Sequence, residues 1–149
     1  MTDSQPPQPD LDAWVGREES TADVASVRSV VGLSAVLDTE PVTTEPGVTP
    51  LFPLGHFLQF TPTARMSELG ADGHPLLGGF MPPIDLPRRM WAGSKITFAQ
   101  PILTGQQLER TTRIDSITPK SGSTGNLCFV VLAHEVLADG VLALTEHQT

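Results

Sequence analysis

A basic stretch with a tryptophan interrupts a chain whose formal net charge is -8. The sequence LPRRMWAGSKITF occupies residues 86–98, and no Asp or Glu occurs in 86–108. The candidate ligand-binding side chains of this stretch are Arg88, Arg89, Trp91 and Lys95. Guanidinium groups bind phosphate oxygens through paired hydrogen bonds, so the stretch favours an anion site. The alternative is that an arginine pairs with Asp85 or with a partner's carboxylate, and that Trp91 packs in the core.

Histidine and cysteine supply the other side chains that could do chemistry. His56 lies in the apolar segment LFPLGHFLQF, where it is either an acid/base candidate or a hydrogen-bonded core or interface residue. His74 follows Asp72 in a Gly-rich segment without metal-ligand spacing, so no metal site is expected. His134 belongs to a strand pattern and is expected in the sheet or at an interface. Cys128 is the single cysteine, which excludes an internal disulfide, and its apolar surroundings indicate a buried structural thiol.

Composition sets the broad class of the protein. At 149 residues and 39% hydrophobic content, one globular domain is expected at 13–149, after a disordered, polar, Pro-rich arm at 1–12. The acidic balance argues against nucleic-acid binding, which needs excess Lys and Arg. No apolar run approaches the ~20 residues of a membrane helix, and the first residues lack a signal-peptide pattern. We therefore expect a cytoplasmic protein that binds neither nucleic acid nor membrane.

The pattern of elements predicts an α+β fold. A helix is expected after Ser20 or Thr21, and a short buried helix is expected within 51–69. Residues 70–87 form a long loop rich in Gly and Pro, in which Gly79 would let the backbone approach a ligand or partner. After Pro87, alternating apolar and polar residues predict at least four antiparallel strands, with ADG as a hairpin turn before the last one.

The order of these elements and several of their sequences resemble the MaoC-like hydratases and dehydratases, whose hot-dog fold wraps a curved antiparallel sheet around a central helix. The resemblance is carried by WVGREE, PLGHFLQFTP, SELGADGHPLLGGFMPPIDLPRRMWAG and NLCFVVLAHEV, and it covers nearly the whole chain after residue 13. More specifically, the chain looks like the N-terminal half of the double hot-dog mesaconyl-C4-CoA (3-methylfumaryl-CoA) hydratases. The resemblance implies that Arg88, Arg89 and Lys95 bind the phosphates of coenzyme A, which is part of the substrate. Trp91 would stack on the adenine or line the acyl tunnel.

Two departures from the family pattern bear on catalysis. The family carries an aspartate and, five residues later, a histidine; here Asp38 and Pro41 fit, but Thr43 stands in the histidine position. Threonine cannot serve as the acid or base that hydration requires. Asp38 is thus either a remnant of that site or a residue at a helix end. The chain also ends at Thr149, whereas the resemblance places catalytic residues in a second hot dog.

Three functions remain open from the sequence. The first is a hydratase or dehydratase of short enoyl-CoA thioesters, with C4–C5 dicarboxylic acyl groups as examples and with the acid/base pair supplied by a second hot-dog domain or subunit. In that case the isolated chain is expected to be inactive. The second is a non-catalytic hot dog that binds acyl thioesters or stabilises a partner, and the third is an acyl-CoA thioesterase. A homo-oligomer, such as a dimer, or a complex with a catalytic hot dog is expected, because a lone sheet leaves an open edge.

Overall fold

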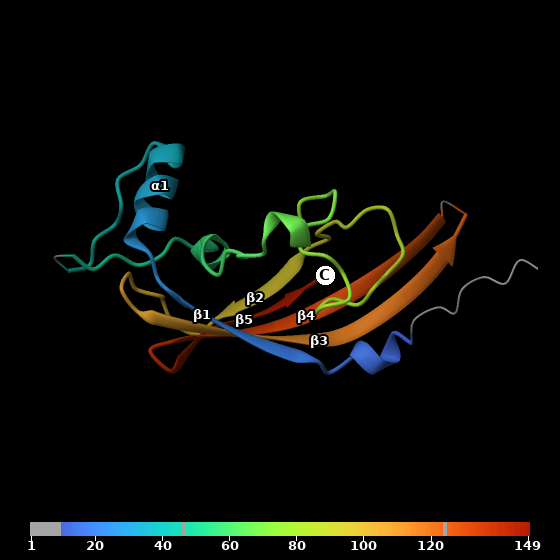
Figure 1. Cartoon of the computed structure of the whole chain (residues 1–149). Helices are drawn as coiled ribbons and strands as arrows, with labels where there is room; N and C mark the ends of the chain where they lie inside the picture. The colour runs from blue at the N-terminus through green and yellow to red at the C-terminus, as the bar shows by residue number, and fades with distance from the viewer. Residues whose placement is uncertain (1–9, 46, 124) are drawn as a thin grey trace, which may run out of the picture.

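The computed structural model describes residues 10–45, 47–123 and 125–149 of the chain. Five antiparallel strands form one curved sheet in the order β1-β3-β4-β5-β2 (Figure 1). The strands are β1 (Glu18–Val24), β2 (Ser94–Phe98), β3 (Gln107–Gly122), β4 (Gly125–Ala138) and β5 (Val141–Gln148). The described helices are α1 (Val27–Leu37) and the 3-10 helices η1 (Asp12–Trp14), η2 (Gly55–Leu58) and η3 (Met66–Glu68). No helix in these ranges is long and apolar enough to cross a membrane.

Alternation along the strands gives the sheet its two faces. Leu108 and Ile114 of β3 are buried, whereas Glu109 and Arg113 face solvent. The turn from β4 to β5 consists of Asp139 and Gly140, with φ of 50° and 78°. Positive φ at both central residues is what a type I′ hairpin requires. The predicted α+β plan, the four antiparallel strands after residue 87 and the ADG hairpin are confirmed.

The first helix begins later than predicted. Residues 18–24 form strand β1, which pairs with β3 from Glu18↔Arg113 to Val24↔Gln107. The helix starts after Ser26, whose hydroxyl accepts a hydrogen bond from the backbone N–H of Arg28. Ser20 and Thr21 therefore do not cap a helix, because the ladder with β3 satisfies the backbone there. β-branched side chains favour a pleated strand over a helix, and this segment contains Thr21 and Val24.

The segment expected to hold a buried helix, 51–69, contains only the single turns η2 and η3. Leu54 and Phe60 flank η2 with positive φ of 68° and 55°, a conformation that cannot continue an α-helix. Pro53 and Pro62 lack the backbone N–H that a longer helix would need. This segment nevertheless lies against the sheet, as its position on the concave side in Figure 1 shows.

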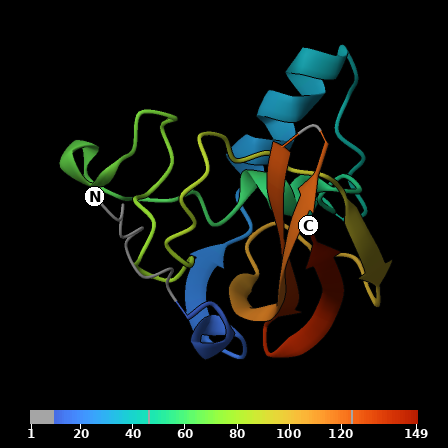
Figure 2. The same cartoon turned by 90° about the vertical axis from the view of Figure 1, so that its right-hand side faces the viewer.

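Helix α1 lies at one end of the sheet and not along its centre, where the resemblance placed it (Figures 1 and 2). Its buried residues are Val30 and Ser34, and it contacts η2, while Val27, Val31 and Val36 are exposed. The hydrophobic core instead lies between the concave face of the sheet and the segment around Phe60. Its members are Ala25, Phe60, Ile102, Leu108, Val136, Ala138, Ala143 and Leu144.

Candidate functional site

A row of polar side chains crosses the sheet on the face that η2 covers. The strand register places Glu19 opposite Thr112, Thr112 opposite His134, and His134 opposite Glu146. Thr112, His134 and Glu146 are 3%, 9% and 3% exposed. Buried polar groups are normally hydrogen-bonded, and a buried row of this kind at the core of a sheet needs a structural or functional reason.

His56 and Glu146 form the centre of this site. η2 places the His56 ring over β5, and its Nε2 lies 3.2 Å from Glu146 Oε2, with both side chains almost fully buried. The other carboxylate oxygen of Glu146 accepts a hydrogen bond from the hydroxyl of Ser94 on β2. The Trp91 indole N–H donates to the same Ser94 oxygen at 3.2 Å. A hydrogen-bonded chain therefore runs from Trp91 through Ser94 and Glu146 to His56.

The electrostatics of Glu146 favour its carboxylate form. Burial alone would raise its pKa, but hydrogen bonds from His56 and Ser94 outweigh burial, and the pKa is lower than usual. An ionised carboxylate only accepts hydrogen bonds, so His56 Nε2 carries the proton and donates it. The second ring nitrogen of His56, Nδ1, is buried and has no hydrogen-bond partner among the described residues. His56 thus has the arrangement of an imidazole oriented by a carboxylate.

His134 is held neutral beside this pair. Burial lowers its pKa, although its hydrogen bond to Gln148 opposes the shift. Its Nε2 lies 3.3 Å from Gln148 Oε1, an acceptor, so Nε2 carries the ring proton. Its Nδ1 then accepts from the Thr112 hydroxyl at 2.9 Å. Both ring nitrogens of His134 form hydrogen bonds with side chains of neighbouring strands, in agreement with the prediction that His134 belongs to the sheet.

A cleft of about 290 Å³ opens next to these residues. Its polar lining includes His56, Arg110, His134, Glu146 and Gln148, and its apolar lining includes Phe57, Phe60 and Val136. Aromatic rings surround His56: Phe57 lies 4.2 Å away and Phe98 6.4 Å away between ring centroids. This volume lies just below the range for small-molecule sites, about 300–1,000 Å³, and favours a short ligand.

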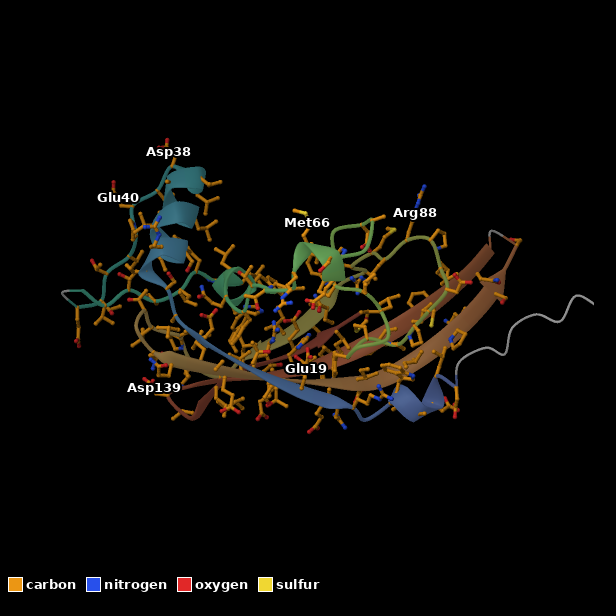
Figure 3. The ribbon with its side chains drawn as sticks, viewed as in Figure 1. Glu19, Asp38, Glu40, Met66, Arg88 and Asp139 are labelled. Atoms are coloured by element: carbon orange, nitrogen blue, oxygen red, sulfur yellow. The ribbon has the colours of Figure 1, made fainter. Side chains whose placement is uncertain are left out.

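The side chains predicted for ligand binding fall into two groups. Trp91 joins the site, because its ring lies 5.9 Å from Phe57 and its N–H reaches Ser94. Arg88 and Arg89 lie on the exposed loop before β2, and Figure 3 shows Arg88 pointing away from the sheet. Lys95 is exposed on the edge strand β2, opposite His147. Within the described ranges, no carboxylate lies within ion-pairing distance of any of these three cations, so the alternative of an ion pair with Asp85 is not observed.

The other predicted positions lie apart from the His56–Glu146 pair. Asp38 is the C-cap of α1, with φ of 53°, and Figure 3 shows it at the tip of the helix, away from the sheet. Thr43 is exposed in the segment that follows. Gly79 is exposed in the loop, next to Gly78, which has a φ of 97°. Cys128 is half-buried, and burial raises the pKa of its thiol.

Sequence reasoning missed Glu146, Ser94 and Arg110. The alternation of buried and exposed residues along the strands could have revealed all three, because each lies at a core-facing position of its strand. Glu146 follows the buried Leu144 by two residues, and Arg110 follows the buried Leu108 by two. Burying a charged side chain on the core-facing side of a strand costs free energy unless the charge is paired or has a function. No group of three or more potential metal ligands occurs among the described residues.

The fold agrees with the proteins to which the chain is similar. Residues 54–149 match the family model of hydroxyacyl-thioester dehydratase type 2, and the chain belongs to this family of MaoC-like hot-dog hydratases and dehydratases. It is 41% identical over 137 residues to the mesaconyl-C(4)-CoA hydratase of Chloroflexus aurantiacus, covering 91% of this chain and 48% of that protein. The chain thus spans about half the length of this relative.

Solved structures confirm the hot-dog fold. The 3R-hydroxyacyl-ACP dehydratase complex HadBC of Mycobacterium tuberculosis matches with a TM-score of 0.56 at 16% identity, over 90% of this chain and 93% of that chain. A MaoC-like dehydratase from Rhodospirillum rubrum gives 0.51 at 14% identity, over 90% and 88%. A hot-dog-like protein from Thermanaerovibrio acidaminovorans also gives 0.51, at 17% identity, over 94% and 84%.

Proposed function

We propose that this chain is one hot-dog unit of a hydratase or dehydratase acting on short enoyl-CoA and 3-hydroxyacyl-CoA thioesters, with C4–C5 dicarboxylic acyl groups as the best candidates. The observation that carries the proposal is the buried His56–Glu146 pair at the wall of a small cleft. Membership in a thioester dehydratase family and the identity to a mesaconyl-C(4)-CoA hydratase support the reaction and the acyl group. We propose the cytoplasm as the place of this reaction.

The pair supplies the two proton transfers that hydration needs. Glu146 holds the Nε2 proton of His56, which leaves the Nδ1 lone pair available as a base. The base takes a proton from water as the oxygen adds to Cβ of the enoyl group, and the imidazolium then returns a proton to Cα. Glu146 stabilises the imidazolium in between, and its own hydrogen bond from Ser94 keeps it ionised and oriented. Dehydration uses the same groups in reverse.

Coenzyme A would lie outside this cleft. Arg88, Arg89 and Lys95 are exposed, without ion-pair partners in the described ranges, and precede or begin the strand that carries Ser94. These cations are available for the phosphates of the coenzyme, while Trp91 links the loop to the Ser94–Glu146 hydrogen bond. Gly79 would let the loop backbone approach the ligand.

A second hot dog, on another chain or on a further part of the same protein, completes the assembly in this proposal. The half-length match to the Chloroflexus relative favours such a second unit. Thr43, in place of the family histidine, favours instead a second candidate, in which a partner with the Asp–His pair does the chemistry. The exposed apolar residues Val31, Val36 and Met90 favour an assembly of this chain over a monomer. If the partner alone does the chemistry, this chain is a non-catalytic acyl-thioester-binding subunit, which is the second candidate.

Replacing His56 separates the two candidates. We expect His56→Gln to lower the rate of mesaconyl-C4-CoA hydration, followed as loss of enoyl absorbance, by about 10²–10⁴-fold in the isolated chain or in its assembly. His147→Gln is the matched control, since His147 is an exposed histidine of the same strand as Glu146. Turnover by the assembly that is equal in His56→Gln and wild type would assign catalysis to the partner. Release of free coenzyme A without hydration would instead identify a thioesterase.

A further inference from the structure

Arg110 is a charged residue at the core face of the sheet that the proposed proton transfers do not use. It lies on β3 between the buried residues Leu108 and Thr112, opposite Val136 of β4. Its side chain lines the same cleft as His56 and Glu146. Its Nε atom is buried and has no hydrogen-bond partner among the described residues. An unsatisfied buried donor on a guanidinium is costly, so the position needs an explanation.

No carboxylate of the described chain neutralises this guanidinium directly. Burial lowers the pKa of Arg110, and Glu19 and Glu146 oppose the shift only from beyond ion-pairing distance. Glu146 is not available as a partner, since one of its oxygens accepts from Ser94 and the other from His56. Glu19 is exposed on the edge strand β1. Arginine stays charged even when partly buried, so the cleft holds a cation that lacks a direct counter-ion.

The guanidinium of Arg110 contacts an aromatic ring. Its central carbon lies 4.8 Å from the centroid of the Phe60 ring, a cation–π contact. Phe60 is itself fixed: its φ is 55°, and its backbone N–H donates to Asp23 Oδ2 at 2.6 Å. A non-glycine residue with positive φ costs energy and persists only where the surrounding structure holds it. Arg110 therefore packs against the Phe60 ring, and both residues line the cleft.

We infer that Arg110 binds a free carboxylate on the acyl group of the substrate, and so selects thioesters of dicarboxylic acids over those of simple fatty acids. A carboxylate can accept from Nε and one terminal nitrogen of the guanidinium together, which would satisfy the orphaned donor. The carboxylate would lie at the Arg110 side of the cleft and the reacting carbons beside His56. This inference deepens the proposed function and rests on it for the identity of the thioester.

Binding of unreactive ligands tests the inference independently of turnover. We would measure, by calorimetry with the full chain in its native assembly, the Kd values of succinyl-dethia-CoA and of its methyl ester. The succinyl group has no double bond to hydrate, and a methylene replaces the thioester sulfur in both ligands, so the thioester position is not hydrolysed. The two ligands differ only in the acyl carboxylate. Hydrogen bonds to charged groups predict that wild type binds the free acid about 10- to 100-fold more tightly than the ester.

Two variants assign the preference to Arg110. Arg110→Gln should remove it while the affinity for coenzyme A alone stays unchanged. Arg113→Gln should retain it, because Arg113 lies on the opposite face of the same strand and pairs with Asp115 at 2.8 Å. If Arg110→Gln does not fold, Arg110→Lys, which keeps the charge but not the paired donors, should reduce the preference several-fold.

The outcomes separate this inference from the proposed function. Equal affinity of wild type for the two ligands, or a preference that survives in Arg110→Gln, would overturn the inference even if hydratase activity is found. A carboxylate preference that depends on Arg110 in a protein without hydratase activity would support the inference and contradict the proposed reaction.

Discussion

Glu146→Gln tests whether the carboxylate at the centre of the site both stabilises the fold and orients His56. The change keeps the size of the side chain and one carbonyl oxygen, which can still accept from Ser94. The carboxylate oxygen that lies 3.2 Å from His56 Nε2 is replaced by the amide NH2 group, and the negative charge is removed. His56 would then place its proton on Nδ1 and accept from the amide, so the nitrogen proposed as the base would be blocked.

The expected loss of stability follows from the two hydrogen bonds. A hydrogen bond to a charged group contributes about 1.5–3 kcal/mol and a neutral one about 0.5–1.5 kcal/mol, so each bond weakens by roughly 1 kcal/mol. Burying an amide costs less than burying a carboxylate, which offsets part of this loss. We expect Glu146→Gln to lower the free energy of unfolding by about 1–2 kcal/mol at pH 7.

The pH dependence gives the sharper test. The pKa of Glu146 is lower in the folded protein than its ordinary value of 4.5, so the unfolded chain binds the proton more readily. The carboxylate therefore adds stability above pH 4.5, and this contribution is lost as the pH falls through the folded pKa. The difference between wild type and Glu146→Gln should shrink over that range.

Urea unfolding at several pH values, followed by tryptophan fluorescence, measures both effects. Glu135→Gln is the matched control, because Glu135 lies on the neighbouring strand β4 but is exposed. Hydration rates of the same variants report the orientation of His56, and we expect Glu146→Gln to lose turnover while Glu135→Gln keeps it. Equal stability of wild type and Glu146→Gln at pH 7, together with equal turnover, would refute the role assigned to this pair.

Two further predictions concern residues next to this pair and on the loop. Burial lowers the pKa of His134 below 6.5, so its neutral form adds stability above pH 6.5, and this stability is lost as the pH falls through the folded pKa. We expect His134→Gln to remove this pH dependence of the free energy of unfolding, which amounts to at most about 1.4 kcal/mol per pH unit. Urea unfolding at several pH values measures it. Arg88→Ala and Arg89→Ala should each weaken coenzyme A binding by about 1–3 kcal/mol, measured by calorimetry. Unchanged affinity in the double variant would exclude the loop from the coenzyme site.

Local patterns were sufficient for much of the sheet. The alternation in β3 and the Asp139–Gly140 turn depend on neighbouring residues alone, so the sequence predicted both. Residues 20–24 were predicted as the start of a helix because Ser20 and Thr21 are good helix caps in isolation, and only the ladder with β3 makes them part of a strand. The position of α1 at the end of the sheet depends on long-range packing, which residue spacing does not encode.

The site was harder to predict because it is assembled across strands. Glu146, His134 and Thr112 are adjacent only through the register of three strands, and His56 reaches them from a single turn 90 residues earlier in the sequence than Glu146. No short motif can contain such a set. The separation also explains why the motif comparison centred on Asp38 and Thr43 pointed to a different part of the molecule.

Charged residues at core-facing strand positions would have predicted the site better than the family motif did. In a half-buried sheet, alternate residues face the core, and a charged side chain among them pays a desolvation cost unless other groups satisfy it. Arg110 and Glu146 both occupy such positions, and both line the same cleft as His56. Leucine at either position would bury apolar area at lower cost, so stability alone does not account for them. Arg110 and Glu146 bring opposite charges to one cleft, which is the feature that the proposed reaction on a charged acyl group would use.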